Sequence, residues 1–178
     1  MDLDSASILF KKTHERLIQE YSFLKLWSSA FDHANRRAGV CKLTEKEISI
    51  SLKHIKNNSE ETVLDTILHE FAHAIAFELH QETGHGVYWK KIASKVGAKP
   101  KATGSFIVPE APWVLIAYCS TKQTIERVAP RFRRNKQIKK YALKGRPKTQ
   151  GKLYYLNAEE LTQFESGAIG IEQLNFIQ

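Results

Sequence analysis

Three histidines and a glutamate form the group in this sequence that is best placed to do chemistry. The motif His69-Glu70-Phe-Ala-His73 is followed at a short interval by Gly84-His85-Gly86. Histidines four residues apart on a helix project from one face about one turn apart, so both can bind one metal ion. Zinc fits such a site, because it takes neutral imidazole nitrogens and keeps one position open for water in catalytic centres.

A third protein ligand is needed, and the residues favour His85. The glycines on either side of it can take the backbone angles that turn the chain back toward the motif. His80 lies on the same helix face as His73, but roughly 10 Å further along at about 1.5 Å per residue, which is too far to share the ion. Glu78 and Glu82 stay open as alternative carboxylate ligands.

Glu70 is placed beside the two helix histidines to act on a zinc-bound water rather than on the metal. Zinc lowers the pKa of its water toward about 7, and a carboxylate can take the water's proton during attack on a carbonyl. The sequence therefore predicts a hydrolase with one Zn²⁺ ion and Glu70 as general base. An oxyanion donor is usual in such sites, with Tyr88, Tyr118 and Arg127 as candidates. A non-peptide substrate stays an alternative.

The helix that must carry this motif is predicted from about Glu60 to about Gln81. Asn58 is placed to cap its first free N–H groups, with Glu61 three residues later reaching back. Apolar residues recur through the segment at helical spacing: they are Val63, Leu64, Ile67, Leu68, Phe71 and Ile75. The histidines are therefore expected on a capped and largely buried helix.

Four segments together resemble one known family: Asn35–Leu43, Glu47–Leu52, His69–His73 and His85–Lys90. At these residues, and over about residues 20 to 100, the sequence is similar to the SprT-like zinc metalloproteases. The resemblance implies zinc held by His69, His73 and His85, with Glu70 as the general base. It also implies hydrolysis of peptide bonds, often in proteins associated with DNA.

Segments on either side of the motif are assigned from their apolar patterns. Ile8–Ile18, capped by Asp4 or Ser5, and the apolar set Phe23–Phe31, continued to about Asn35, predict helices. Ile48–Leu52 alternates apolar and polar residues as a half-buried strand does, and His54 after it is expected to be exposed. Tyr88–Val96 predicts a helix that ends at Gly97 and has Trp89 in the core.

Zinc proteases in general pair the substrate backbone with an edge strand beside the motif helix. By resemblance, Ile48–Leu52 is the candidate for that strand, and an internal strand without a substrate role is the alternative. The expected fold class is α+β, with a zincin-like helical metalloprotease domain and a short edge-strand sheet over residues 1–103. A small, basic, antiparallel β subdomain and a tail follow over residues 104–178.

The second part begins after Lys99–Gly104, a segment typical of a linker. Short runs of β-forming residues follow at Phe106–Val108, Trp113–Tyr118 and Lys152–Leu156. SprT-like proteins often carry a zinc ribbon in this region, but three of its four cysteines are missing here. We therefore expect apolar packing to replace the second zinc. Asn157 is placed to cap a short helix that ends near Glu165.

Positive charge is concentrated between Arg127 and Lys152, where eleven Lys or Arg occur with no Asp or Glu. Such density, interleaved with Phe132, Tyr141, Tyr154 and Tyr155, is typical of a groove for single-stranded or non-specific DNA. No segment resembles a recognition helix, so base-specific contacts are not expected. The candidate contacts are Arg127, Arg131, Arg133, Arg134, Lys136, Lys139 and Lys140. Charge that serves only solubility is the alternative.

Composition bounds the class of protein. The chain has 178 residues, a net charge of +8 and an apolar share of 42%, as expected for one cored domain with an added subdomain. The sequence predicts no signal peptide and no apolar run that could span a membrane. Cys41 and Cys119 lack disulfide or metal spacing. We therefore expect a cytoplasmic, DNA-associated protease, and the alternative is a non-catalytic nucleic-acid-binding protein with a structural or idle zinc site.

Overall fold

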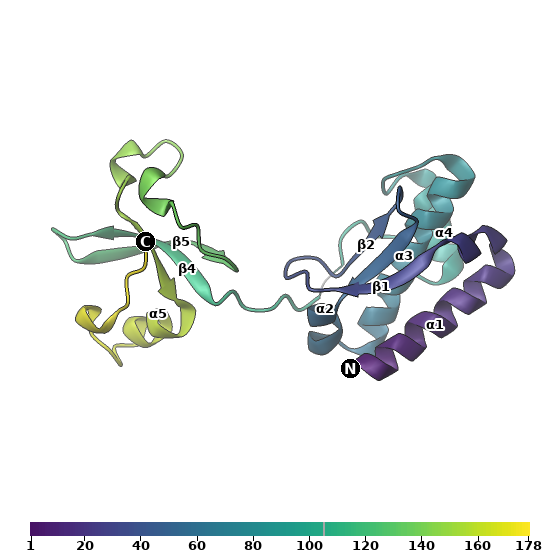
Figure 1. Cartoon of the computed structure of the whole chain (residues 1–178), viewed down its shortest axis with the longest axis horizontal. Coiled ribbons are helices and arrows are strands. Elements are labelled where there is room, and N and C mark those ends of the chain that lie inside the picture. The colour runs from purple at the N-terminus through teal and green to yellow at the C-terminus, as the bar shows by residue number, and fades with distance from the viewer. Residues whose placement is uncertain (105) are drawn as a thin grey trace. The chain divides into compact units, whose positions relative to one another are not determined.

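A computed structural model describes residues 1–104 and 106–178 (Figure 1). The described chain forms two compact units, Met1–Pro109 and Glu110–Gln178, and the sequence had placed the boundary after residue 103. Each unit contains helices and a three-stranded sheet, which confirms a mixed α+β fold. None of the described helices is long and apolar enough to cross a membrane.

The first unit packs its helices around a small mixed sheet. Its elements are α1 (Leu3–Glu20), the 3₁₀ helix η1 (Ser22–Leu26), β1 (Ser28–Asp32), β2 (Gly39–Lys42), β3 (Glu47–Ser51), α2 (Leu52–Asn57), α3 (Glu60–His80) and α4 (Val87–Val96). The strand order is β1-β3-β2, with β1 parallel and β2 antiparallel to β3. Helix α3 contacts α1, α4, β2 and β3, so it forms the centre of the unit.

Helix α3 has the predicted extent but a different cap. The side chain of Ser59 accepts a hydrogen bond from the N–H of Thr62 and begins the helix. Asn58, the expected cap, instead bonds the carbonyl of His54 and the N–H of Ile107. Apolar residues along α3 pack into the core, as the helical spacing predicts.

The prediction of a helix over Phe23–Phe31 is wrong. That segment forms η1 and then the edge strand β1, whose residues pair with β3. The apolar spacing also suits this arrangement, because Trp27 is buried and Phe31 packs edge-on against Phe10. A parallel pairing that brings in distant backbone groups outweighs a local helical pattern.

The predicted strand at Ile48–Leu52 exists, but it is not an edge strand. As β3 it lies between β1 and β2, with Ile48 and Ile50 fully buried. Leu52 begins α2, which carries His54 into the core at 2% exposure rather than to the surface. The edge strand that contacts α3 is β2. It has four residues, which are too few to show an alternating pattern.

The second unit is an antiparallel sheet in the order β5-β4-β6, built from β4 (Trp113–Cys119), β5 (Thr124–Arg131) and β6 (Leu153–Asn157). Helix α5 (Ala158–Glu165), capped by Asn157 as predicted, covers one face, and the 3₁₀ helices are η2 (Ile138–Lys140), η3 (Pro147–Thr149) and η4 (Ile171–Gln173). Strand β5 was missed because it is rich in charge and contains Pro130. Phe106–Val108 forms no strand, so that prediction is wrong.

Candidate metal centre

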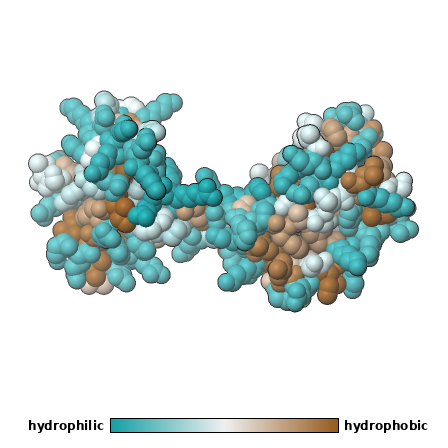
Figure 2. Space-filling view, viewed as in Figure 1, coloured by the Kyte–Doolittle hydropathy of each residue, from teal (hydrophilic) through white to brown (hydrophobic). Residues whose placement is uncertain are grey.

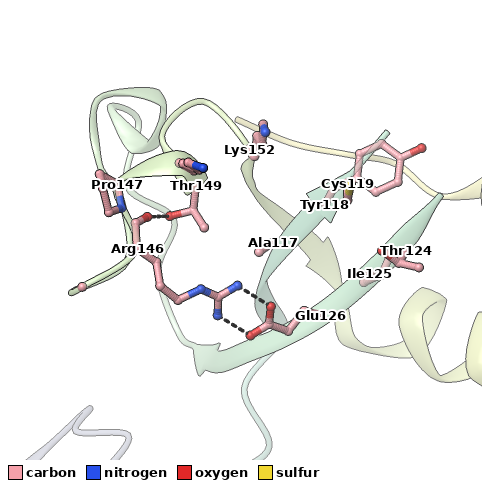
Figure 3. Close-up of a pocket in the computed structure, with 12 residues that line it drawn as sticks. Ala117, Tyr118, Cys119, Thr124, Ile125, Glu126, Arg146, Pro147, Thr149 and Lys152 are labelled. Atoms are coloured by element: carbon pink, nitrogen blue, oxygen red, sulfur yellow. Dashed lines mark hydrogen bonds and ion pairs between the residues drawn. The ribbon is translucent and has the colours of Figure 1, made fainter. Parts of the chain in front are cut away.

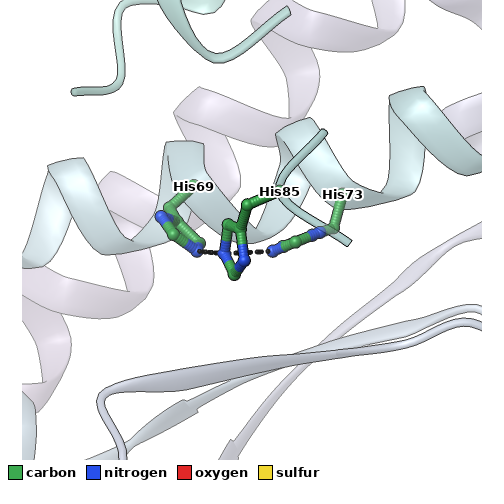
Figure 4. Close-up of side chains that lie close together, drawn as sticks. All are labelled: His69, His73 and His85. Atoms are coloured by element: carbon green, nitrogen blue, oxygen red, sulfur yellow. Dashed lines mark hydrogen bonds between the residues drawn. The ribbon is translucent and has the colours of Figure 1, made fainter. Parts of the chain in front are cut away.

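His69, His73 and His85 point their rings toward one another (Figure 4). His69 and His73 project from α3, and His85 reaches them from the loop between α3 and α4. The Nε2 atom of His85 lies 3.0 Å from Nε2 of His69 and 3.1 Å from Nε2 of His73. Nitrogens that bind one tetrahedral zinc at about 2.0–2.1 Å stand roughly 3.3 Å apart, so this donor set fits the ion.

The protonation of the three histidines also favours metal binding. Burial lowers the pKa of His73 to about 3, with further lowering by His69 and His85. Burial likewise lowers the pKa of His69 and of His85, helped by His85 and by Lys90 respectively. The rings are therefore neutral at neutral pH, and neutral imidazole is the form that binds metal.

The Trp89 ring packs against all three imidazole rings. It lies on α4, is fully buried as predicted, and its ring centroid is 4.7 Å from His69, 5.3 Å from His73 and 4.4 Å from His85. Contact with a rigid indole limits the rotation of each imidazole. Such packing would hold the three rings in place for a metal ion.

Glu70 opens onto the same cleft as the histidines. Glu70 as a residue is 8% exposed, and burial raises its pKa to about 7 against the lowering effects of the Arg37 guanidinium and the N–H of Cys41. The cleft has a volume of about 300 Å³. Its lining consists of Gly39, Val40, Cys41, Leu43, His69, Glu70, His73, Thr83 and His85. Glu70, the three histidines and strand β2 therefore share one space.

Strand β2 is the part of this site that the sequence analysis did not identify. A Cβ atom on Gly39 would lie 2.8 Å from Cγ of Glu70 and 3.0 Å from Cδ1 of Ile50. Gly39 therefore allows the strand to approach the base closely. The resemblance had included Asn35–Leu43, but the pattern gave no sign of which strand faced the helix.

The alternative ligands have other partners. Glu78 pairs with Lys46 and accepts a hydrogen bond from Nε1 of Trp27. Glu82 accepts from the backbone N–H of Trp89, and the His80 ring stacks on Tyr88. Among the described residues, His69, His73 and His85 are the group that could hold a metal ion.

The turn toward His85 is not made by glycine angles, contrary to expectation. Gln81 takes the left-handed conformation, with φ 55°, and Gly86 has φ −76°. The lack of a side chain at Gly86 matters for space instead, because a Cβ there would lie 2.1 Å from Oε1 of Glu82.

The predicted DNA contacts in the second unit fall into two groups. Arg127 forms a two-bond ion pair with Glu165. Arg146, which was not among the predicted contacts, forms a similar pair with Glu126 beside a cleft of about 560 Å³ (Figure 3). The others lie in residues 131–140, where Ile138 is the buried residue. They are Arg131, Arg133, Arg134, Lys136, Lys139 and Lys140. Figure 2 shows hydrophilic surface over this part of the unit.

Two of the four aromatic residues expected to stack on bases, Tyr154 and Tyr155, are engaged in contacts within the second unit. Tyr155 is buried and its hydroxyl accepts the N–H of Asn135, while Tyr154 packs against Tyr118 and Phe176. Tyr141 is 52% exposed. Arg134 lies over the Trp113 ring at 4.5 Å, so this cation is held on an aromatic face.

The three candidate oxyanion donors all have contacts of their own. Tyr88 stacks on His80, Tyr118 packs against Phe176, and Arg127 pairs with Glu165. In the described part of the chain, the cleft around the three histidines is lined by none of these candidate donors.

Comparison with known proteins gives a family and no individual relative. The family model described as the SprT-like family matches residues 7–107, more than half of the chain. The match covers β2, α3 and α4, and with them the histidine group and Glu70. No curated protein and no solved structure matches the chain.

Proposed function

The chain belongs to the SprT-like family, and from this premise we propose that it is a zinc-dependent peptidase. One observation carries the proposal: three imidazole Nε2 atoms converge beside the carboxyl of Glu70 in a cleft whose wall is a strand edge. A structural zinc site has no need of a carboxylate or of a free strand edge there. We propose as well that the first unit is a zincin-like metalloprotease domain.

In the proposed reaction, His69, His73 and His85 hold the zinc ion. Bound there, zinc supplies a Lewis acid and lowers the pKa of a water molecule. Glu70 takes the proton from the attacking water and returns it to the leaving amine. Trp89 keeps the three imidazoles in position and excludes water from beneath them.

Strand β2 is the proposed binding edge for the substrate, in place of β3. Just before β2, the carbonyl of Ala38 accepts a hydrogen bond from the N–H of Ser51. In an antiparallel pair every second residue bonds to the partner strand, so alternate residues of β2 direct their backbone groups to β3. The backbone groups of Gly39 and Cys41 consequently face the other way. The N–H of Cys41 lowers the pKa of Glu70, whose carboxyl shares the cleft with β2, so the proposed base lies at the edge where an extended peptide would pair.

We also propose that residues 131–140 bind DNA without base specificity, so that the protein substrates are DNA-associated. The six cations of this segment release counterions when they meet phosphates. The described part of the segment offers no helix long enough to read a groove. A non-catalytic nucleic-acid-binding protein is the second candidate function, because this surface would serve it equally.

The deciding experiment measures cleavage of a generic DNA-binding protein, and of the chain itself, with and without single-stranded DNA. Glu70→Gln should lower the rate about 10²–10⁴-fold while zinc stays bound, because it removes the general base and no ligand. Glu61→Gln, an exposed change at the start of α3, is the matched control. Zinc binding without cleavage in any condition would reject the peptidase and favour the second candidate.

A further inference from the structure

The chain turns sharply between α3 and His85. Gln81 ends α3 in the left-handed conformation, and its N–H donates to the carbonyl of Phe77 at 2.9 Å. The N–H of Glu82 lies 3.4 Å from the carbonyl of Ala76. These bonds hold the backbone of Gln81 and Glu82 against the last turns of the helix. Glu82 is therefore the first residue beyond the turn, and its backbone is fixed to α3.

The side chain of Glu82 then crosses to the start of α4. Its Oε2 atom accepts a hydrogen bond from the N–H of Trp89 at 2.6 Å. Gly86, the N-cap residue of this helix, has no side chain that could accept from the first turn. The Glu82 carboxylate provides the cap from four residues upstream, in the position where negative charge is favoured by the helix dipole.

Gly86 leaves the space that this cap needs. A Cβ atom at Gly86 would lie 2.1 Å from Oε1 and 2.6 Å from the carboxyl carbon of Glu82. The carboxylate therefore rests against the backbone of Gly86 while it bonds Trp89. The loop between Glu82 and Gly86 is therefore held at both ends. It consists of Thr83, Gly84 and His85.

The position of His85 depends on the conformation of this loop, whereas the positions of the other two histidines depend on α3. His69 and His73 are held by the backbone of α3, whereas His85 has no helix to fix it. Trp89, the residue that Glu82 bonds, is also the residue whose ring contacts all three imidazoles. One hydrogen bond thus joins the loop of the third histidine to the support of the whole group.

We propose that Glu82 is a positioning residue, which holds His85 ready for the metal by capping α4. The inference rests on the zinc site of the proposed function. Glu82 is not itself part of the histidine group, and its carboxylate is engaged by Trp89. Removing a partner that orients a ligand typically weakens metal binding 10–100-fold.

The test compares Glu82→Ala and Glu82→Gln with wild type and with Glu61→Ala, which removes the same charge from an exposed position. Zinc affinity is measured by competition with a chelator. We expect Glu82→Ala to weaken it about 10–100-fold and Glu82→Gln to weaken it less, because an amide oxygen still accepts a hydrogen bond. Glu61→Ala should leave it unchanged.

Two further measurements identify the cause. In the zinc-free protein, the Trp89 amide should exchange its hydrogen faster in Glu82→Ala than in the control, since its acceptor is gone. The visible spectrum of the cobalt-substituted protein should keep the wild-type shape, because the ligands are the same. Glu82→Gln keeps the size of the side chain, so it also serves if Glu82→Ala does not fold.

Three outcomes would overturn the inference. Unchanged zinc affinity in Glu82→Ala would mean that His85 needs no positioning. An altered cobalt spectrum, with Glu82→Gln as weak as Glu82→Ala, would make Glu82 a ligand. Wild type without zinc affinity would remove the site and the inference together. Wild type that binds zinc and cleaves nothing would reject only the peptidase, because affinity still decides the role of Glu82.

Discussion

The two units hold their functional groups in different ways. In Met1–Pro109 the histidines and Glu70 are partly or fully buried and are directed to one point by α3, α4 and a short loop. In Glu110–Gln178 the cations of residues 131–140 lie mostly at the surface around η2. Buried groups in fixed geometry act together, whereas exposed charges act nearly independently through the total field.

This contrast predicts how each unit responds to change. A single substitution in the first unit should remove a whole function, because each member of the site has one role. In the second unit, several charges must be removed before binding changes much. The distribution of ion pairs adds to the difference, since Arg127 and Arg146 are already paired with Glu165 and Glu126.

The largest expected effect tests whether the units are separate. Leu156→Ala, in the core of the second unit, should destabilise that unit by about 2–5 kcal/mol through the lost apolar contacts and the cavity left behind. Calorimetry should show a lower melting temperature for one transition, while zinc affinity in the first unit stays unchanged. A loss of zinc binding that accompanies the lower melting temperature would contradict the comparison.

His73→Ala should remove most of the zinc affinity. Sharing about 10–16 kcal/mol of zinc-binding energy among three histidines gives about 3–5 kcal/mol for each, which is more than a hundredfold in affinity. His80→Ala is the matched control, because its ring stacks on Tyr88 outside the ligand group. Chelator competition measures both, and an equal loss in the two variants would reject the assignment of ligands.

Gly39→Ala should cost about 1–3 kcal/mol of stability, because the new methyl group would overlap Glu70 and Ile50. Denaturant unfolding measures the loss. Val40→Ala, one position along β2, is the comparison, since it shortens a partly buried side chain and adds no overlap. If Gly39→Ala were as stable as wild type, β2 would not press on the base.

Replacing Arg131, Arg133 and Arg134 by Ala should reduce the slope of log affinity against log salt by about 2 for single-stranded DNA. The matched control removes three exposed lysines from the first unit and should change the salt slope little. They are Lys11, Lys12 and Lys25. Fluorescence anisotropy at several salt concentrations gives both slopes. Equal slopes in the two triple variants would leave the charge with a solubility role.

The smallest effect concerns His54 and pH. Its Nδ1 atom faces the amide of Asn58 and its Nε2 atom faces the hydroxyl of Thr66, and burial lowers its pKa below the usual 6.5. The folded state therefore binds its proton less tightly than the unfolded chain does. The stabilising contribution is complete above pH 6.5 and is lost as the pH falls toward the lowered pKa.

Unfolding free energies measured between pH 5 and 8 would check this expectation, with His54→Gln as the comparison. The variant should lose part of the acid dependence of stability. His33→Gln, at an exposed position, should keep all of it. An acid dependence that is the same in all three proteins would assign it to other groups.

The ligand spacing and the main helix were readable in the sequence. His69, Glu70 and His73 follow from their order on a helix, and α3, α4 and α5 end within a residue or two of their predicted limits. Local rules suffice for these features, because caps, glycine stops and a 3.6-residue repeat depend on neighbours along the chain. The structure also brings His85 beside this pair, although the chain turns at Gln81 and not through the glycine angles that the sequence suggested.

Only the tertiary structure decided what lies around those residues. Strand β3 became the centre of its sheet because β1, expected to be helical, pairs with it on one side and β2 on the other. The same pairing buried His54 and left β2 as the edge beside Glu70. The order of the strands, and the residue that each carboxylate bonds, depend on segments that lie far apart in the chain. A local sequence pattern does not specify which of these segments come together.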